Sequence, residues 1–295
     1  MKTKQKKIIE FARRYRIKEG SNFRLKEIDP GDTWKFKTDK KSKELLASGV
    51  ELMSEMQEKL YAQDRWSLLL IFQAMDAAGK DGTIKHVMSG VNPQGCDVHS
   101  FKAPSPVELN HGYLWRSNLV MPERGKIGIF NRSYYEEVLV LRVHKELLHA
   151  EKIPASLVTK DIWKERFEDI NAYERYLSRN GVVIRKFFLH LSKAEQKRRF
   201  LARLDEPGKN WKFSGADLKE RAFWGESMEA YEDAIRNTST KEAPWYVVPA
   251  DNKWFTRLVV AGVINETLDS LGLSFPKVTS EQKDVLDHAR KVLTE

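Results

Sequence analysis

The sequence has 295 residues, of which 41% are hydrophobic and 32% charged, a composition typical of a globular protein with a substantial core. Lysine and arginine outnumber the acids by 51 to 42, and the net charge of +9 favours a polyanionic partner: nucleic acid, an anionic membrane or a phosphate-rich substrate. The single cysteine, Cys96, excludes an internal disulfide and a cysteine-based metal site. With no secretory signal and no apolar run of membrane length, we expect a cytoplasmic protein.

The predicted elements begin with a polar, basic extension over residues 1–40, which we expect to run over the surface. An amphipathic helix follows over 40–64, and the apolar run 67–72 is typical of a strand buried on both faces. Further strands are predicted at 96–101, 126–131, 182–189 and 245–248. Helices are predicted after Pro104, with Ser105 as its cap and Glu108 three residues on, and over 133–143, 159–179, 193–204, 216–236 and 254–271, with a short one in the tail. Ser192 is the predicted cap of the helix 193–204.

Strands that alternate with helices predict a parallel sheet in a three-layer α/β domain. We expect this domain to span residues 41–275, with a helical lid at about 192–224. Residues 276–295 are predicted to form a C-terminal helical tail.

The turn between the first strand and its helix indicates a phosphate-binding loop. Small residues allow backbone N–H groups to surround a phosphate, a helix N-terminus favours an anion, and a lysine reaches the transferred group. Ala74 and Asp81 depart from the strict G-x-x-x-x-G-K-[ST] pattern, and an acid, Asp76, lies inside the loop. The alternative is an ordinary turn. The predicted phosphate-binding residues are Asp76, Ala77, Ala78, Gly79, Lys80, Asp81, Gly82 and Thr83.

Ligands of parallel α/β sheets bind at the carboxyl ends of the strands, so the end of the strand 126–131 belongs to the same edge. Asn131 stands where many phosphate-loop proteins place aspartate, and it ligates a metal or forms a hydrogen bond without adding negative charge. Arg132 follows, and its guanidinium suits phosphate oxygens. A strand-terminal turn with a solvated arginine is the alternative.

Cations are concentrated on the helix 193–204 and just after it, namely Lys193, Lys197, Arg198, Arg199, Arg203, Lys209 and Lys212. Such a run is either a solvated helix face or a lid that closes over phosphates. Three further residues are weaker candidates. Arg116 is placed to reach an anion, whereas Glu136 and Glu137 either contact a nucleotide or favour a helix N-terminus.

Four segments together resemble the polyphosphate kinase 2 family: QAMDAAGKDGTIKHVMSGVNPQG, GKIGIFNRSYYEEVLVLRVH, EQKRRFLARLDEPGKNWKFS and APWYVVPADNKWF. The resemblance covers roughly Asn22 to Leu271. The Phe-Asn-Arg-Ser form of the second segment is similar to the subgroup that accepts nucleoside mono- and diphosphates. Gly112 departs from the family, whose members often carry aspartate there.

The resemblance implies a thymidylate-kinase-like core, Mg²⁺ with Mn²⁺ as the alternative ion, and a homotetramer. It implies reversible phosphate transfer from inorganic polyphosphate to AMP and ADP, with guanine nucleotides as further acceptors. By analogy Asp76, Lys80 and Arg132 are catalytic, Asp76 and Asn131 hold the metal, and the basic lid binds polyphosphate. We then expect the loop to bind the acceptor nucleotide and the lid to bind the donor.

Two other functions remain open from the sequence. An ATP-dependent nucleotide kinase would use the same fold. Its loop would be expected to carry the serine or threonine of the strict pattern at the position of Asp81. A non-catalytic polyanion-binding protein would explain the charge, although no nucleic-acid-binding module and no membrane segment is recognisable.

Overall fold

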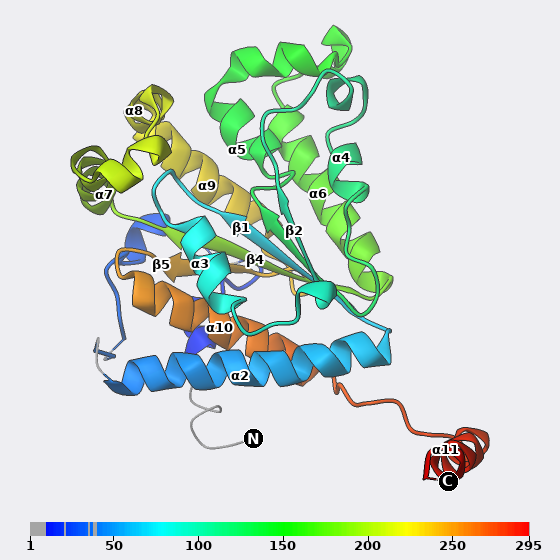
Figure 1. Ribbon diagram of the computed structural model, residues 1–295. Helices are drawn as coiled ribbons and strands as arrows, with labels where there is room; N and C mark the ends of the chain where they lie inside the picture. Colours follow the sequence, from blue (N-terminus) through cyan, green and yellow to red (C-terminus); the bar gives the residue numbers. More distant parts are fainter. Residues whose placement is uncertain (1–9, 21, 35, 38–39, 295) are drawn as a thin grey trace.

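The computed structural model describes residues 10–20, 22–34, 36–37 and 40–294, and its centre is a five-stranded parallel sheet (Figure 1). The strands are β1 (Ser67–Gln73), β2 (Cys96–Ser100), β3 (Ile127–Asn131), β4 (Val182–His190) and β5 (Trp245–Pro249). Their order across the sheet is β2-β3-β1-β4-β5. The predicted parallel sheet is therefore confirmed, and β1, with its phosphate loop, lies at its centre.

Helices cover both faces of the sheet, which gives the predicted three layers (Figure 1). One face carries α2 (Lys40–Gln63), α3 (Lys80–Val87) and α10 (Lys253–Ser270), and the other carries α5 (Glu136–Val143), α6 (Ile162–Arg179) and α9 (Trp224–Thr238). Alternate side chains of β1 enter the two cores: Leu68 and Leu70 on the first face, Leu69 and Ile71 on the second. Burial on both faces explains why β1 is a continuous apolar run.

The remaining elements are short or lie at the periphery. Two helices, α7 (Lys193–Asp205) and α8 (Gly215–Ala222), fall in the predicted lid, called the lid region below, and are joined by the 3₁₀ helix η7 (Pro207–Lys212). The helix α4 (Trp115–Asn118) precedes β3. The other 3₁₀ helices are η1 (Arg13–Tyr15), η2 (Leu25–Glu27), η3 (Pro93–Gly95), η4 (Glu108–Asn110), η5 (Lys145–Glu151) and η6 (Ala155–Leu157). As predicted, the Ser192 hydroxyl caps α7 by accepting from the Glu195 N–H at 3.1 Å.

The N-terminal segment is packed into the fold, contrary to the expectation of a surface extension. The Ile17 N–H donates to the Trp245 carbonyl at 2.9 Å, so the segment pairs with the exposed edge of β5. Phe11 and Tyr15 are buried in one core and Phe23 in the other. Residues 1–9, 21, 35 and 38–39 of the predicted extension lie outside the described residues.

Two helix predictions were wrong. The segment after Pro104 forms only η4, because the chain becomes extended at His111 although Ser105 and Glu108 make the predicted reciprocal cap. The predicted helix 216–236 is two helices, α8 and α9, which separate at Phe223. The break lets α8 turn back toward α7, where Asp217 pairs with Arg203 at 3.2 Å.

The tail helix α11 (Ser280–Thr294) is present, as predicted, and stands apart from the body in Figure 1. Among the described residues, no helix is both long enough and apolar enough to cross a membrane.

Candidate functional site

The phosphate loop connects β1 to α3 and has the shape that its sequence predicts. Ala77 and Gly79 have left-handed backbone conformations, with φ of 62° and 98°. This conformation favours glycine and strains an alanine by on the order of 1 kcal/mol. The loop ends at the N-terminus of α3, where the helix dipole favours an anion. Lys80, the first residue of α3, donates to the Ala74 carbonyl at 3.1 Å and so lies across the loop.

The end of β3 brings two more predicted residues to the loop. Arg132 also has a left-handed backbone, with φ of 65°, and its guanidinium lies 3.6 Å from the Asp76 carboxylate. The Asn131 amide donates to the Asp81 carboxylate at 2.7 Å. Burial, followed by the neighbouring charge of Arg132, lowers the pKa of Lys80. A bound phosphate would offset both effects, as expected of a site built for an anion.

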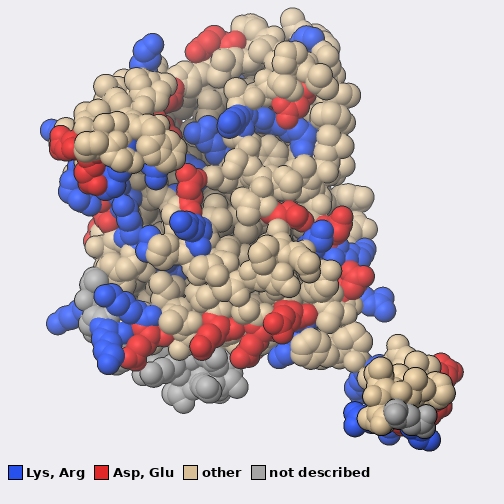
Figure 2. Space-filling view, viewed as in Figure 1, with Lys and Arg blue, Asp and Glu red and all other residues tan. Residues whose placement is uncertain are grey.

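These residues line a cleft of about 590 Å³ whose walls are the loop, the ends of β2 and β3, the lid region and the start of α10. Figure 2 shows Lys and Arg side chains gathered around α7 and beside the N-terminal end of α3. The lining side chains are mainly cationic: Lys80, Lys102, Arg132, Arg198, Arg199, Arg203, Lys209, Lys212, Lys253 and Arg257. The cleft is thus suited to a ligand with several negative charges.

Most lid cations that line the cleft are paired with nearby acids. Arg198 donates twice to Glu195, at 2.6 Å each, and Arg203 pairs with Asp217 at 3.2 Å. Lys209 pairs with Glu206. These pairs are partly exposed and weak, so an anionic ligand could displace the acids at small cost.

Arg199 differs from the other lid cations because all five of its N–H groups are already used. Its Nε donates to Glu195, and one terminal nitrogen donates to the carbonyls of Ala77 and Ala78 at 3.0 and 2.8 Å. The other terminal nitrogen donates to the carbonyls of Ala250 and Asp251 at 2.7 and 3.0 Å. Arg199 lines the cleft but is a clamp between the phosphate loop and the segment after β5, whereas the sequence predicts a ligand of the donor.

A second cavity, of about 310 Å³, adjoins the cleft on the side of α5 and α9. It shares Asp76 and Arg132 with the cleft. The rest of its wall is mixed: apolar side chains of Leu139, Val140, Val143 and Tyr231, and the acids Glu136, Asp217 and Glu220. Glu136 is fixed at its entrance, where it accepts from Gln73 at 2.8 Å and lies 3.9 Å from Arg132. This wall suits a ring with polar edges better than a polyanion.

Four predicted site residues lie away from both spaces. Lys193 and Lys197 are exposed on α7, and the Lys193 ammonium lies 5.9 Å from the centre of the Trp224 ring. Arg116 and Glu137 are buried and form an ion pair with each other at 3.1 Å. The neighbouring Arg166 donates to the Glu137 carbonyl at 2.8 Å. Burial, together with the nearby Glu151 carboxyl, raises the pKa of Glu137 to about 8.

Three cations of the cleft were missed by the sequence prediction: Lys102, Lys253 and Arg257. Lys102 lies just beyond β2 and Lys253 just beyond β5, so the rule that ligands bind at the carboxyl ends of strands could have found them. Arg257 lies one helical turn after Lys253. Its Nε is buried and has no hydrogen-bond partner among the described residues, which is a further sign that the cleft receives an anion.

The metal prediction names Asp76 and Asn131, and both residues line the cleft. Among the described residues there is no group of three or more histidine, cysteine or acidic side chains that could hold a metal alone. This donor set fits Mg²⁺, which usually takes one or two protein carboxylates and completes its shell with water and substrate phosphates.

Three comparisons with known proteins indicate the same family for this chain. Residues 35–274 match the family model for polyphosphate kinase 2. The chain is 51% identical to an ADP-polyphosphate phosphotransferase of Rhodopseudomonas palustris, over 96% of this chain and 98% of the relative. It is 43% identical to an AMP/ADP-polyphosphate phosphotransferase of Meiothermus ruber, over 93% of this chain and all of the relative. The crystal structure of polyphosphate kinase 2 from Arthrobacter aurescens superimposes with a TM-score of 0.84, at 40% identity, over 94% of this chain and 96% of that one.

Proposed function

The chain belongs to the polyphosphate kinase 2 family, and we propose on this premise that it is a phosphotransferase that moves a phosphate from inorganic polyphosphate to AMP and ADP. The product is ADP from AMP and ATP from ADP.

One observation carries the proposal: two spaces of different chemical character meet at Asp76 and Arg132. A phosphoryl transfer needs a donor and an acceptor that approach each other in line, with positive charge and a metal-binding carboxylate at the meeting point. Arg132 and Asp76, 3.6 Å apart, are the residues common to both spaces.

The basic cleft is the site for polyphosphate. A polyphosphate chain carries a charge on every unit, and the cations of the cleft extend from the loop across the lid to Lys253 and Arg257. Because the loop and the lid line one and the same cleft, this assignment replaces our expectation that the loop binds the acceptor while the lid binds the donor.

The second cavity is the site for the acceptor nucleotide. Its apolar wall suits a purine ring, and Glu136 and Asp217 are acceptors for polar groups on the base or ribose. The acceptor phosphate then points to Arg132 and Asp76. Guanine presents other polar groups than adenine but has the same ring size, so guanine nucleotides are included as acceptors.

The chain's own residues supply position and charge, as phosphoryl transfer requires. Lys80 and Arg132 neutralise the transferring group, and the N–H groups of residues 79–82, at the start of α3, surround it. A bound Mg²⁺, held by Asp76 and Asn131 together with substrate oxygens, would supply further charge neutralisation. An acceptor phosphate needs no general base, so Asp76 serves to hold and orient.

The proposal extends to the lid and the assembly. Residues 192–224 close over the donor. Because Arg199 fastens the first two turns of α7 to the loop, the movement is confined to the residues of 192–224 that follow Arg199.

We propose further that the reaction is reversible, that the protein forms a tetramer, and that it acts in the cytoplasm, where its nucleotide substrates are found.

The test is a direct assay. Purified protein with polyphosphate, Mg²⁺ and AMP should form ADP and then ATP, whereas ATP offered as donor to AMP should react much more slowly. A faster reaction with ATP would make the protein a nucleotide kinase. Polyphosphate binding without any nucleotide product would leave only a polyanion-binding function.

A further inference from the structure

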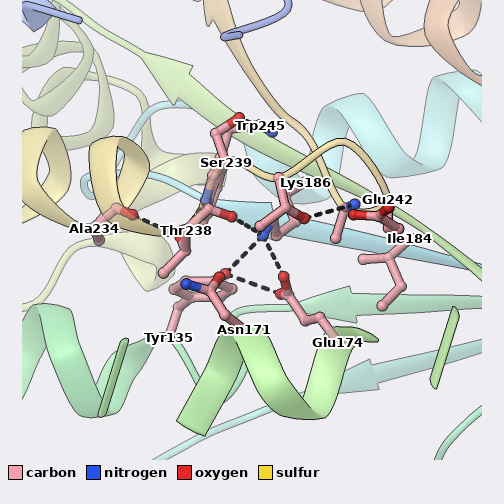
Figure 3. Close-up of polar contacts among 12 residues, drawn as sticks. Tyr135, Asn171, Glu174, Ile184, Lys186, Ala234, Thr238, Ser239, Glu242 and Trp245 are labelled. Carbon is pink, nitrogen blue, oxygen red and sulfur yellow. Dashed lines mark hydrogen bonds and ion pairs between the residues drawn. The ribbon is translucent and has the colours of Figure 1, made fainter. Parts of the chain in front are cut away.

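A buried ion pair lies beneath the site, on the sheet face that carries α5, α6 and α9 (Figure 3). Lys186 of β4 and Glu174 of α6 are paired at 2.5 Å, and their side chains are 0% and 1% exposed. Neither lines the cleft or the second cavity. The reaction as described above does not use them.

Every polar atom of this pair has a partner. The Lys186 ammonium donates to Glu174, to the Tyr135 hydroxyl at 2.8 Å and to the Thr238 carbonyl at 2.7 Å. The second Glu174 oxygen accepts from the hydroxyls of Tyr134 and Tyr135, both at 2.9 Å. A buried ion pair is costly to desolvate, and a pair of apolar side chains often stabilises a core as well or better. The network therefore requires an explanation other than stability.

The partners show what the network holds in place. Tyr134 and Tyr135 come two and three residues after Arg132, whose backbone is in the left-handed region. The Ser133 hydroxyl accepts from the Tyr135 N–H at 3.1 Å, so a hydrogen bond connects the residue after Arg132 to Tyr135. Glu136 follows directly and lies at the entrance of the second cavity. The tyrosine hydroxyls thus anchor the far end of the turn that directs Arg132 toward Asp76.

The third hydrogen bond that the Lys186 ammonium donates reaches the end of α9, the helix that lines the second cavity opposite α5. Thr238 is the last residue of α9, the helix that carries Tyr231 and Ser227 into the second cavity. Its hydroxyl is held by the Trp245 indole N–H at 2.8 Å. One ammonium group therefore contacts both Tyr135, which precedes α5, and Thr238, the last residue of α9 (Figure 3).

We propose that Lys186 and Glu174, acting through Tyr134 and Tyr135, are positioning residues that hold Arg132 in its strained turn and set the spacing of the acceptor cavity's walls. This inference rests on the proposed function for its effect on transfer. The structural part of it, the ordering of residues 131–136, does not depend on turnover.

The first test is Tyr135→Phe, with Tyr173→Phe as the matched control. Tyr173 lies on α6, beside Glu174, but its hydroxyl donates to Asn118 at 3.1 Å, outside the network. We expect Tyr135→Phe to lower kcat with AMP about tenfold, because a misplaced arginine stabilises the transferring group poorly. The KM for polyphosphate should stay within about twofold and the control should match wild type. An unchanged kcat in Tyr135→Phe would contradict the proposal.

A double-mutant cycle separates positioning from general weakening of the fold. If Tyr135 acts through Arg132, then Tyr135→Phe has little further effect on kcat in an Arg132→Lys background. If its tenfold loss appears undiminished in that background, the hydroxyl does not act through Arg132 and the proposal fails.

Two measurements complete the test. Replacing both charges, in Lys186→Met with Glu174→Leu, leaves no buried charge unpaired; we expect a folded protein whose kcat falls as in Tyr135→Phe, and a wild-type kcat would contradict the proposal. Amide hydrogen exchange needs no turnover. Residues 131–136 should exchange faster in Tyr135→Phe than in Tyr173→Phe, and equal exchange overturns the positioning role. Absence of transfer by wild type would instead overturn the proposed function.

Discussion

The Arg199 guanidinium donates to the Ala78 carbonyl at 2.8 Å, so the base of the lid helix is fastened to the phosphate loop. The same nitrogen holds the carbonyl of Ala77, whose backbone is left-handed. A loop that binds phosphate through its N–H groups must turn carbonyl groups away from the ligand. Arg199 binds those carbonyls, and its charge contributes to the field of the cleft that it lines.

The first prediction concerns this clamp. Arg199→Met leaves the loop carbonyls without their donor, a loss of about 1–3 kcal/mol, and should lower the melting temperature by roughly 2–4 °C for each kcal/mol. Because the loop is then less ordered, kcat should fall at least about tenfold. Calorimetry and steady-state kinetics measure the two effects.

Arg198→Met is the matched control, because Arg198 also lines the cleft but forms an exposed pair with Glu195 and does not hold the loop carbonyls. It should raise the KM for polyphosphate a few-fold and leave the melting temperature nearly unchanged. If Arg199→Met gave the same result as Arg198→Met, Arg199 would be an ordinary ligand of the donor and the clamp would have no role.

The second prediction concerns Asp76, the acid shared by both spaces. Asp76→Asn removes a charge that holds Arg132 and Mg²⁺, and we expect kcat to fall about a hundredfold or more. Polyphosphate binding should persist or strengthen, since the cleft becomes more positive. Fluorescence titration with polyphosphate and a luminescent ATP assay measure these separately.

Glu206→Gln serves as the comparison for Asp76→Asn, because Glu206 also lines the cleft but lies in the lid region. Like Asp76→Asn, Glu206→Gln removes one negative charge from the cleft, but it should retain most of the transfer activity. Equal losses in the two variants would mean that Asp76 acts only through the net charge of the cleft.

The third prediction tests the acceptor cavity. Val140→Trp fills part of the space between α5 and α9. We expect the KM for AMP and ADP to rise about tenfold, with the KM for polyphosphate within about twofold of wild type. Leu147→Trp, at an exposed position outside the cavity, should have neither effect. A rise in the polyphosphate KM with an unchanged nucleotide KM would reverse our assignment of the two spaces.

The fourth prediction is a pH dependence of stability. The pKa of Glu137 is raised from 4.5 to about 8, first by burial and then by Glu151, so the folded protein binds this proton more tightly than the unfolded chain does. The resulting stabilisation is complete below pH 4.5 and is lost as the pH rises through about 8. In Glu137→Gln, the neutral amide stands in for the protonated carboxyl, and this loss is absent.

Melting temperatures between pH 5 and 9 should therefore diverge, with Glu137→Gln melting roughly 3–5 °C above wild type at the alkaline end and close to it at the acid end. Parallel curves for the two proteins across this range would show that Glu137 stays ionised beside Arg116.

Much of the fold follows from short-range patterns. The apolar run of β1, the small residues and glycine of the phosphate loop and the Ser192 cap of α7 were predicted because each signal is contained in a few consecutive residues. The rule that strand ends meet at one edge also brought Asn131 and Arg132 to the loop. These predictions depend only on local propensity and on the geometry shared by all parallel α/β sheets.

The tertiary structure alone decided how individual side chains are used. Arg199 and Arg198 are neighbours in a basic helix, and the sequence treats them alike. Both line the cleft, but Arg199 is a clamp because Ala77–Ala78 and Ala250–Asp251, distant in sequence, present carbonyl groups to it, whereas Arg198 forms an exposed pair with Glu195. Arg116 and Glu137 look like site residues until folding buries them against each other. Residue type and spacing thus predicted a phosphate site, but which charges are free to serve it depends on long-range hydrogen-bond partners, which only the folded chain brings together.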